Sequence, residues 1–194
     1  MKQLNQYINE KFKLSSKNIG SKYKYHPKDR KELKLIIDKE LENQQGFDII
    51  VDLNMIDVSK ITDLSYIFST LDYNTKIDVS EWDVSKVNSF KGLFVELEEF
   101  DCDLSNWDVS NGRNFQTMFR NCTNFTGKGL ENWNMSKADN IQFIFTYDHN
   151  LNFDYESWFD KLKNKELKSQ LIDSLDSCKQ IKKELIEQYK KKYL

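Results

Sequence analysis

A repeat of 25 or 26 residues occupies the middle of the chain and constrains its fold more than any other feature. The triplet Asp-Val-Ser begins at Asp57, Asp83 and Asp108, and a fourth copy has Asn134 in place of the aspartate. Units that recur at such an interval stack on one another, because one unit alone cannot bury its apolar side chains. Phenylalanine and tryptophan recur at the same interval, as Phe68, Phe94, Phe119 and Phe145, and as Trp82, Trp107, Trp133 and Trp158.

The first half of each unit predicts a short strand. The segments KIDVSEW, CDLSNW and KGLENW alternate between polar and apolar residues, which points one side chain of each toward a common core. An earlier segment, VDLNMI, predicts the opening strand, and Ile56 takes the place of the tryptophan. Five units can be counted. The side chains predicted to face the core from these strands are those of Leu53, Val79, Leu104 and Leu130.

The second half of each unit predicts a short helix. Apolar residues fall at helical spacing in every copy, as with Ile61, Leu64, Ile67 and Phe68 in the first. A serine precedes each run, and its hydroxyl is a suitable N-cap because it can accept a free backbone N–H. The predicted capping residues are Ser59, Ser85, Ser110 and Ser136.

Together these patterns predict an α/β fold, a right-handed leucine-rich-repeat-like solenoid of about five strand–helix turns of 25–26 residues. A parallel sheet would form one face. The repeats would span residues 51–158, between helical caps at residues 1–50 and 159–194. Caps are expected because an exposed terminal strand would be an edge prone to aggregation.

Within the N-terminal cap, the segment HPKDRKELKLIIDKELENQQG predicts a helix with Pro27 in its first turn and Gly46 at its end. A shorter amphipathic helix is predicted before it, around Leu4, Tyr7, Ile8, Lys11 and Phe12. After Trp158 helical periodicity continues to the C-terminus in ESWFDKLKN, KELKSQLIDSLDSCK and IKKELIEQYKKKYL.

The repeat resembles that of the BspA-like leucine-rich-repeat family of bacterial surface proteins and Mycoplasma-type lipoproteins. The segment DLSNWDVSNGRNFQTMFRNCTNF, Asp103 to Phe125, carries the clearest match, and the resemblance extends from Val51 to Trp158. It implies adhesion or protein binding without shared catalytic residues. The compact layout looks like the stand-alone intracellular members of bacteria and their phages.

The net charge of −2 conceals an acidic middle between basic ends. Residues 57–160 contain 18 acidic and 8 basic residues. This balance argues against binding of nucleic-acid phosphates by the repeats. A cluster of lysines near the C-terminus is expected to form a solvated helix face, with docking on an acidic partner or nucleic acid as the alternative. These residues are Lys182, Lys183, Lys190, Lys191 and Lys192.

No segment reaches the roughly 18 consecutive apolar residues that a membrane helix needs. The first residues, MKQLNQYINEKFKLSSKN, do not resemble a secretion signal. We therefore expect a cytoplasmic protein that does not contact a membrane, in the host-cell cytoplasm if a phage encodes it. Cys102, Cys122 and Cys178 are expected to be reduced thiols.

The residues that usually carry catalysis or bind cofactors are sparse and scattered. His26 and His149 have no companion at metal-binding spacing, and Gly127-Lys128-Gly129 lacks the helix that follows a phosphate-binding loop. A column of the repeated aspartates could bind calcium, but we favour hydrogen bonds to the backbone N–H two residues later. The tryptophans could form a sugar-binding platform, but packing between turns is favoured. We expect no enzyme activity, cofactor or metal.

Residues that break the repeat are the candidates for partner recognition. The segment VELEEFDCD, Val95 to Asp103, carries more acidic residues than the repeat requires, either as a solvated loop or as a docking surface. Variable positions on the predicted strand face complete the set. The candidate partner-binding residues are Asp78, Ser80, Glu81, Glu96, Glu98, Glu99, Asp101, Asp103, Ser105, Asn106, Glu131 and Asn132.

The function expected from these features is a non-catalytic protein–protein interaction module whose partner has a basic surface. Two alternatives stay open. One is a phage or mobile-element inhibitor of a host defence or nucleic-acid enzyme, acting through the acidic surface. The other is a surface adhesin. The sequence leaves the oligomeric state open.

Overall fold

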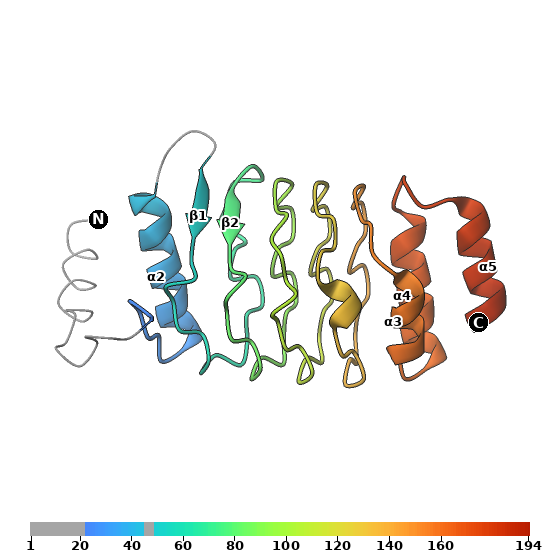
Figure 1. Cartoon of the computed structure of the whole chain (residues 1–194), viewed down its shortest axis with the longest axis horizontal. Helices are drawn as coiled ribbons and strands as arrows, with labels where there is room; N and C mark the ends of the chain where they lie inside the picture. The colour runs from blue at the N-terminus through green and yellow to red at the C-terminus, as the bar shows by residue number, and fades with distance from the viewer. Residues whose placement is uncertain (1–21, 45–48) are drawn as a thin grey trace.

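The computed structural model describes residues 22–44 and 49–194. The repeats lie side by side between helix α2 at one end and helices α3, α4 and α5 at the other (Figure 1). The elements, in chain order, are α2 (Arg30–Asn43), β1 (Ile50–Asp52), β2 (Lys76–Asp78), the short 3₁₀ helix η2 (Leu130–Asn132), α3 (Tyr155–Lys161), α4 (Lys165–Asp176) and α5 (Lys183–Tyr193).

The predicted solenoid of five strand–helix turns is wrong. The described residues form one sheet, in which β1 and β2 pair in parallel with Val51 opposite Ile77. Neither CDLSNW nor KGLENW forms a strand, and η2 lies within the latter. No α-helix occurs in the described residues between β1 and α3. The repeats are instead turns and extended segments.

Hydrogen bonds between units replace the helical hydrogen bonds that the apolar spacing predicted. The Leu64 N–H donates to the Ser89 carbonyl, and the equivalent Phe90 N–H donates to the Asn114 carbonyl in the next unit. Within the first unit, the Ile67 N–H instead donates to the Leu64 carbonyl three residues earlier, which forms a tight turn. These bonds give the buried backbone groups the hydrogen-bond partners that an α-helix would otherwise supply.

A left-handed residue recurs in each unit and also prevents helix formation. Tyr66, Gly92, Thr117 and Phe143 occupy equivalent positions and have φ angles of 51°, 57°, 55° and 59°. A right-handed α-helix cannot continue through a residue in this conformation. Residues with a Cβ adopt it at a cost of about 1–2 kcal/mol. The N–H groups of Tyr66, Gly92 and Thr117 donate to carbonyls of the next unit, at 2.9, 2.9 and 3.0 Å, and these bonds offset the cost.

The predicted serine caps are also replaced. In the first copy the Ser59 N–H donates to the Asp57 carboxylate at 3.1 Å, and the copies at Asp83 and Asp108 repeat this bond. This confirms the expectation that the repeated aspartates bind local backbone N–H groups. Such turns compete with helix formation, since they offer the backbone another partner.

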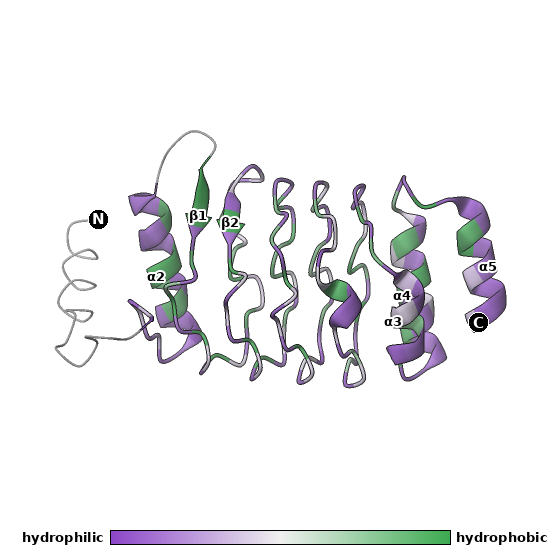
Figure 2. Ribbon diagram, in the orientation of Figure 1, coloured by the Kyte–Doolittle hydropathy of each residue, from purple (hydrophilic) through white to green (hydrophobic). Residues whose placement is uncertain are grey.

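The predicted core residues are buried even though their local structure differs. Leu53, Val79, Leu104 and Leu130 are fully buried, as are most residues of the helix-like spacing. Hydrophobic and hydrophilic residues alternate along the turns, as expected when one side of each turn faces the core (Figure 2).

The aromatic columns run through the whole stack. The Phe94 ring stacks on the rings of Phe68 and Phe119, with centroids 5.8 and 5.6 Å away. The Trp107 and Trp133 rings lie 6.3 Å apart and nearly parallel. Each indole N–H donates to a carbonyl of the preceding unit, as Trp107 does to Val79 at 3.0 Å. The expected packing of tryptophans between turns is confirmed.

At the N-terminal end, α2 is capped by Asp29, whose carboxylate accepts the Glu32 N–H. Pro27 therefore lies before the helix, and the prediction that it lies in the first turn is wrong. Leu33, Ile36 and Ile37 of α2 are buried in the common core. The predicted helix around residues 4–12 and the predicted stop at Gly46 lie outside the described residues.

At the C-terminal end, α4 supplies oxygen atoms to the last repeat unit. The Gln170, Ser174 and Ser177 side chains accept the N–H groups of Ile141, Phe145 and Tyr147, at 3.0, 2.7 and 3.2 Å. Gln170 and Ser174 lie four residues apart on one face of α4, and Ser177 is the residue that caps its C-terminus. Helix α4 thus satisfies backbone groups that have no further unit to bind. No helix in the described part of the chain is long and apolar enough to cross a membrane.

Candidate functional site

Glu96 and Glu98 present carboxylates that no other described group binds. The Glu96 N–H donates to the Arg120 carbonyl at 2.9 Å, and the Glu98 carbonyl accepts the Asn124 N–H at 3.0 Å. Their backbones are thus fixed to the next unit, whereas neither carboxylate makes a hydrogen bond or ion pair within residues 22–44 and 49–194. The Glu96 side chain is exposed, and Glu98 is half-buried. These two side chains are therefore held at a defined place on the surface.

Glu99 and Asp101 instead bind the following unit. The Asn124 side chain donates to the Glu99 carboxylate at 3.0 Å. The Asp101 carboxylate accepts both the backbone N–H and the hydroxyl of Thr126, at 2.9 and 2.7 Å. Two of the five acidic residues in this loop therefore have a structural role that the sequence pattern did not reveal.

Asp103 has a cationic partner that compensates its negative charge. Its carboxylate forms an ion pair with Lys128 at 2.7 Å and accepts the N–H and hydroxyl of Ser105, at 3.0 and 2.5 Å. Chiefly because of Lys128, the pKa of the Asp103 carboxyl is lowered to about 2. Lys128, in the predicted turn at Gly127–Gly129, therefore acts as the partner of this aspartate.

Asp78 and Glu81 also have partners. Burial raises the pKa of Asp78, but hydrogen bonds from Ser80, Asn54 and Cys102 outweigh this effect and the pKa is lowered overall. The Ser80 N–H donates to this carboxylate at 2.9 Å. Glu81 is exposed and forms an ion pair with Lys22 at 2.6 Å.

The remaining predicted residues are exposed and lie at equivalent positions of successive units. Asn106 and Asn132 occupy the position of Glu81, and Ser105 and Glu131 lie directly before them. The Lys161 ammonium donates a hydrogen bond to the Glu131 backbone carbonyl at 2.5 Å, and the Glu131 side chain is exposed. These residues form a second, largely polar surface apart from Glu96 and Glu98 in the repeat.

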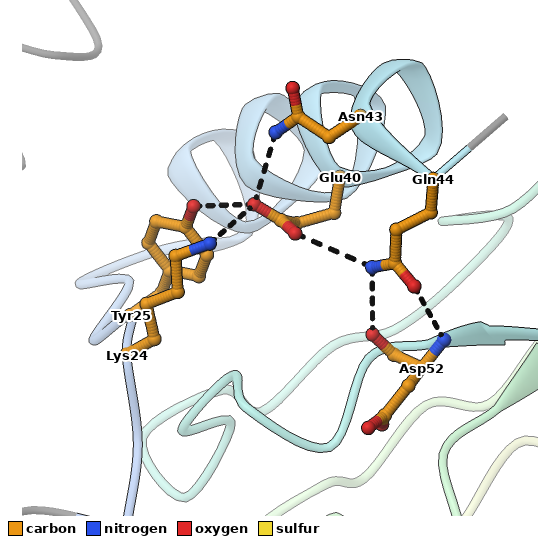
Figure 3. A network of polar contacts seen from close by, with 6 residues as sticks. All are labelled: Lys24, Tyr25, Glu40, Asn43, Gln44 and Asp52. Carbon is orange, nitrogen blue, oxygen red and sulfur yellow. Dashed lines mark hydrogen bonds and ion pairs between the residues drawn. The ribbon is translucent and has the colours of Figure 1, made fainter.

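A buried carboxylate, Glu40 of α2, is the centre of a polar network (Figure 3). It accepts hydrogen bonds from the Tyr25 hydroxyl and from Lys24 at 3.2 Å, and from the Asn43 and Gln44 amides at 3.4 Å each. Burial raises the pKa of Glu40, but these bonds outweigh it and the pKa is lowered.

The same network ties α2 to the first strand. The Gln44 side chain donates to the Asp52 carbonyl at 3.2 Å and accepts the Asp52 N–H at 3.1 Å. A side-chain amide therefore pairs with the edge of β1 much as another strand would, and it links this edge to the buried Glu40.

The thiols and imidazoles do not assemble into a reactive group. Burial raises the pKa of Cys102 and of Cys178 to about 12, and that of Cys122 well above its usual range. The His26 ring lies 3.0 Å from the Asp57 carboxylate, and the His149 ring accepts the Lys179 N–H at 3.5 Å. Within the described ranges, no three His, Cys, Asp or Glu side chains are placed to hold a metal ion.

Asp148 is an acidic residue that the sequence reasoning did not single out. It is fully buried, its Oδ1 accepts the Cys122 N–H at 2.8 Å, and its Oδ2 has no hydrogen-bond partner. Burial raises the pKa of this carboxyl well above its ordinary value. The repeat did hold a signal, because Asp148 occupies the core position of Leu71, Leu97 and Cys122.

Two further exposed acidic residues, Glu42 and Asp72, were also missed. They come from α2 and from the first repeat, and they line one groove together with Glu99. Nothing in the spacing of these residues indicates that they meet, because α2 lies outside the repeat. Only the packing of α2 against the first units brings them to the same place.

The chain was compared with protein families, curated proteins and solved structures. No curated protein and no solved structure is significantly similar to the chain. A profile of the family described as "Mycoplasma protein of unknown function, DUF285" matches residues 38–158, which include all the repeats and the end of α2. Since the match covers more than half of the chain, this protein belongs to the Mycoplasma DUF285 family.

Proposed function

We propose that this chain is a non-catalytic protein-interaction module whose acidic surface binds a partner protein with a basic surface. One observation carries the proposal. Glu96 and Glu98 hold exposed or half-exposed carboxylates on a backbone that is fixed by bonds to the next unit. Charges held in this way attract a complementary surface over long range and lose little conformational freedom on binding.

The other acidic residues of the same loop support this division of roles. Asp103 forms an ion pair with Lys128, and Asp101 accepts a hydrogen bond from Thr126. Both carboxylates are therefore less available to a partner than those of Glu96 and Glu98. Within this loop, Glu96 and Glu98 are therefore proposed as the principal contacts. The resemblance of the repeats to BspA-like proteins also favours protein binding over catalysis.

The test is a direct binding measurement with a matched charge control. The full chain is used to capture partners from the cells that produce it, and the captured protein is then purified and titrated calorimetrically against the chain. The variant Glu96→Gln/Glu98→Gln removes two charges and no described hydrogen bond. The control variant Asp160→Asn/Glu166→Gln removes two exposed charges from α3 and α4.

We expect a stoichiometric complex that the first variant weakens at least about tenfold, or about 1.4 kcal/mol, and the control by less than about twofold. Equal weakening by both variants would mean that only overall charge matters. Failure of any captured protein to bind as a purified component would reject the interaction function itself.

A further inference from the structure

A groove separates the C-terminal half of α2 from the loops that join the first repeats. Its volume is about 780 Å³, and it lies at the end of the stack where α2 runs beside β1 (Figure 1). The walls are formed by residues of α2, of β1 and its flank, and of the two following loops. This groove was not anticipated from the sequence, because it depends on how α2 packs.

The groove has an apolar side. Leu41 and Leu71 are partly buried and pack against the core, and Val51 is buried beneath them. Ile49, at the rim, is 38% exposed. An aliphatic or aromatic side chain of a ligand would remove this apolar surface from water, which is the main driving force for such association.

The rim of the groove is acidic. Glu42 and Asp72 are exposed, and neither carboxylate has a hydrogen bond or ion pair in the described part of the chain. Asp38 is paired with Lys34, and Glu99 accepts the neutral Asn124 amide. Among the described lining residues Lys76 is the one cation, so acidic groups outnumber basic ones.

The end of α2 adds to this negative potential. A helix carries a partial negative charge at its C-terminus, where a basic side chain usually compensates it. The last turn of α2 has no basic residue, and Leu41, Glu42 and Gln44 from this end line the groove. The helix end, the carboxylates and the apolar wall therefore all favour the same kind of ligand.

We infer that the groove binds an amphipathic segment of the partner protein, in which lysine or arginine side chains meet Glu42 and Asp72 while apolar side chains cover Leu41 and Leu71. This inference rests on the proposed interaction function and specifies where a basic partner docks. Long basic side chains suit such a site because their aliphatic stems pack on apolar surface while their charged ends reach the rim.

The experiment uses a fluorescein-labelled synthetic peptide of alternating lysine and leucine, titrated with the full chain and followed by fluorescence anisotropy at low salt. The variant Glu42→Gln/Asp72→Asn should weaken binding at least about fivefold. The control variant Asp160→Asn/Glu166→Gln, with the same change of charge, should weaken it less than about twofold. Equal weakening by the two variants, or no binding of the peptide, would overturn the inference.

Two further peptides separate the contributions of charge and apolar surface. A peptide of alternating lysine and serine should bind more weakly than the lysine–leucine peptide, and a glutamate–leucine peptide should not bind. Equal affinity of the lysine–serine peptide would reject the apolar contact. If the purified natural partner binds but is insensitive to Glu42→Gln/Asp72→Asn, the groove is wrong while the interaction function stands. If no partner binds at all, the proposed function itself fails.

Discussion

The Ser174 hydroxyl accepts the backbone N–H of Phe145 at 2.7 Å. In the two preceding units the equivalent N–H groups of Phe119 and Phe94 donate to the carbonyls of Ile144 and Met118, which belong to the next unit. The Ser174 hydroxyl of α4 therefore replaces the backbone carbonyl that a following unit would supply. The stack ends where a helix can offer side-chain oxygens in place of backbone carbonyls.

Loss of this hydroxyl should destabilise the fold. Ser174→Ala leaves the buried Phe145 N–H without an acceptor, and we expect the free energy of unfolding to fall by about 1–3 kcal/mol. The control is Ser177→Ala, because Tyr147 is half exposed and water can replace the lost hydroxyl. Urea denaturation measures both. Equal losses for the two variants would contradict the role of Ser174.

Two glycines should differ in their tolerance of a Cβ. At Gly129, with φ 93°, a Cβ would lie 2.2 Å from the backbone nitrogen of Ser105, so Gly129→Ala should cost more than about 3 kcal/mol. At Gly92, with φ 57°, the three atoms nearest to a Cβ all belong to the ring of Tyr66, which is 39% exposed and can move. Gly92→Ala should therefore cost about 1–2 kcal/mol. Thermal unfolding of both variants tests this order, and the reverse order would refute the close backbone approach at Gly129.

Replacement of the buried Asp148 should stabilise the chain. Asp148→Leu restores the residue type of equivalent positions 71 and 97 and removes a carboxyl with an unsatisfied oxygen, so we expect a gain of about 1–3 kcal/mol at neutral pH. The Cys122 N–H keeps its other acceptor, the Phe119 carbonyl.

The pH dependence provides a second test of Asp148. The carboxyl ionises near pH 3.9 in the unfolded chain but keeps its proton to a higher pH in the folded one. The unfolded state therefore binds fewer protons above about pH 4, and the wild-type protein should lose stability relative to Asp148→Asn as the pH rises. Parallel pH profiles for the two proteins would show that Asp148 is charged in the fold.

Glu40 should show the opposite pH dependence. Its pKa is lowered in the folded state, so its contribution is present above the unfolded pKa of about 4.3 and is lost as the pH falls through the folded value. Glu40→Gln should reduce the free energy of unfolding by about 1.5–3 kcal/mol at neutral pH, and by less in acid. Glu42→Gln, which removes an exposed carboxylate of the same helix, should change it by less than about 0.5 kcal/mol. A constant difference between wild type and Glu40→Gln across this pH range would contradict the lowered pKa.

The sequence predicted which residues are buried better than it predicted their local structure. Ile61, Leu64, Ile67 and Phe68 have helical spacing and are all buried, yet no helix forms. Their spacing also suits a chain of tight turns, and the left-handed conformation of Tyr66 cannot be read from its identity. The sequence identified the acidic loop but not which of its carboxylates have partners. Asp101 is hydrogen-bonded because Thr126 lies beside it in the fold, and Thr126 is 25 residues away in the sequence.

Both proposals require that backbone hydrogen bonds join the units, since these bonds fix the positions of the acidic side chains. Scalar couplings across hydrogen bonds, measured by nuclear magnetic resonance on the isotope-labelled full chain, test this most directly. We predict couplings from the Phe94 amide nitrogen to the Met118 carbonyl carbon and from the Phe90 nitrogen to the Asn114 carbonyl carbon. A coupling from the Phe94 nitrogen to the carbonyl of Phe90, four residues earlier, would instead show a helix and contradict the account.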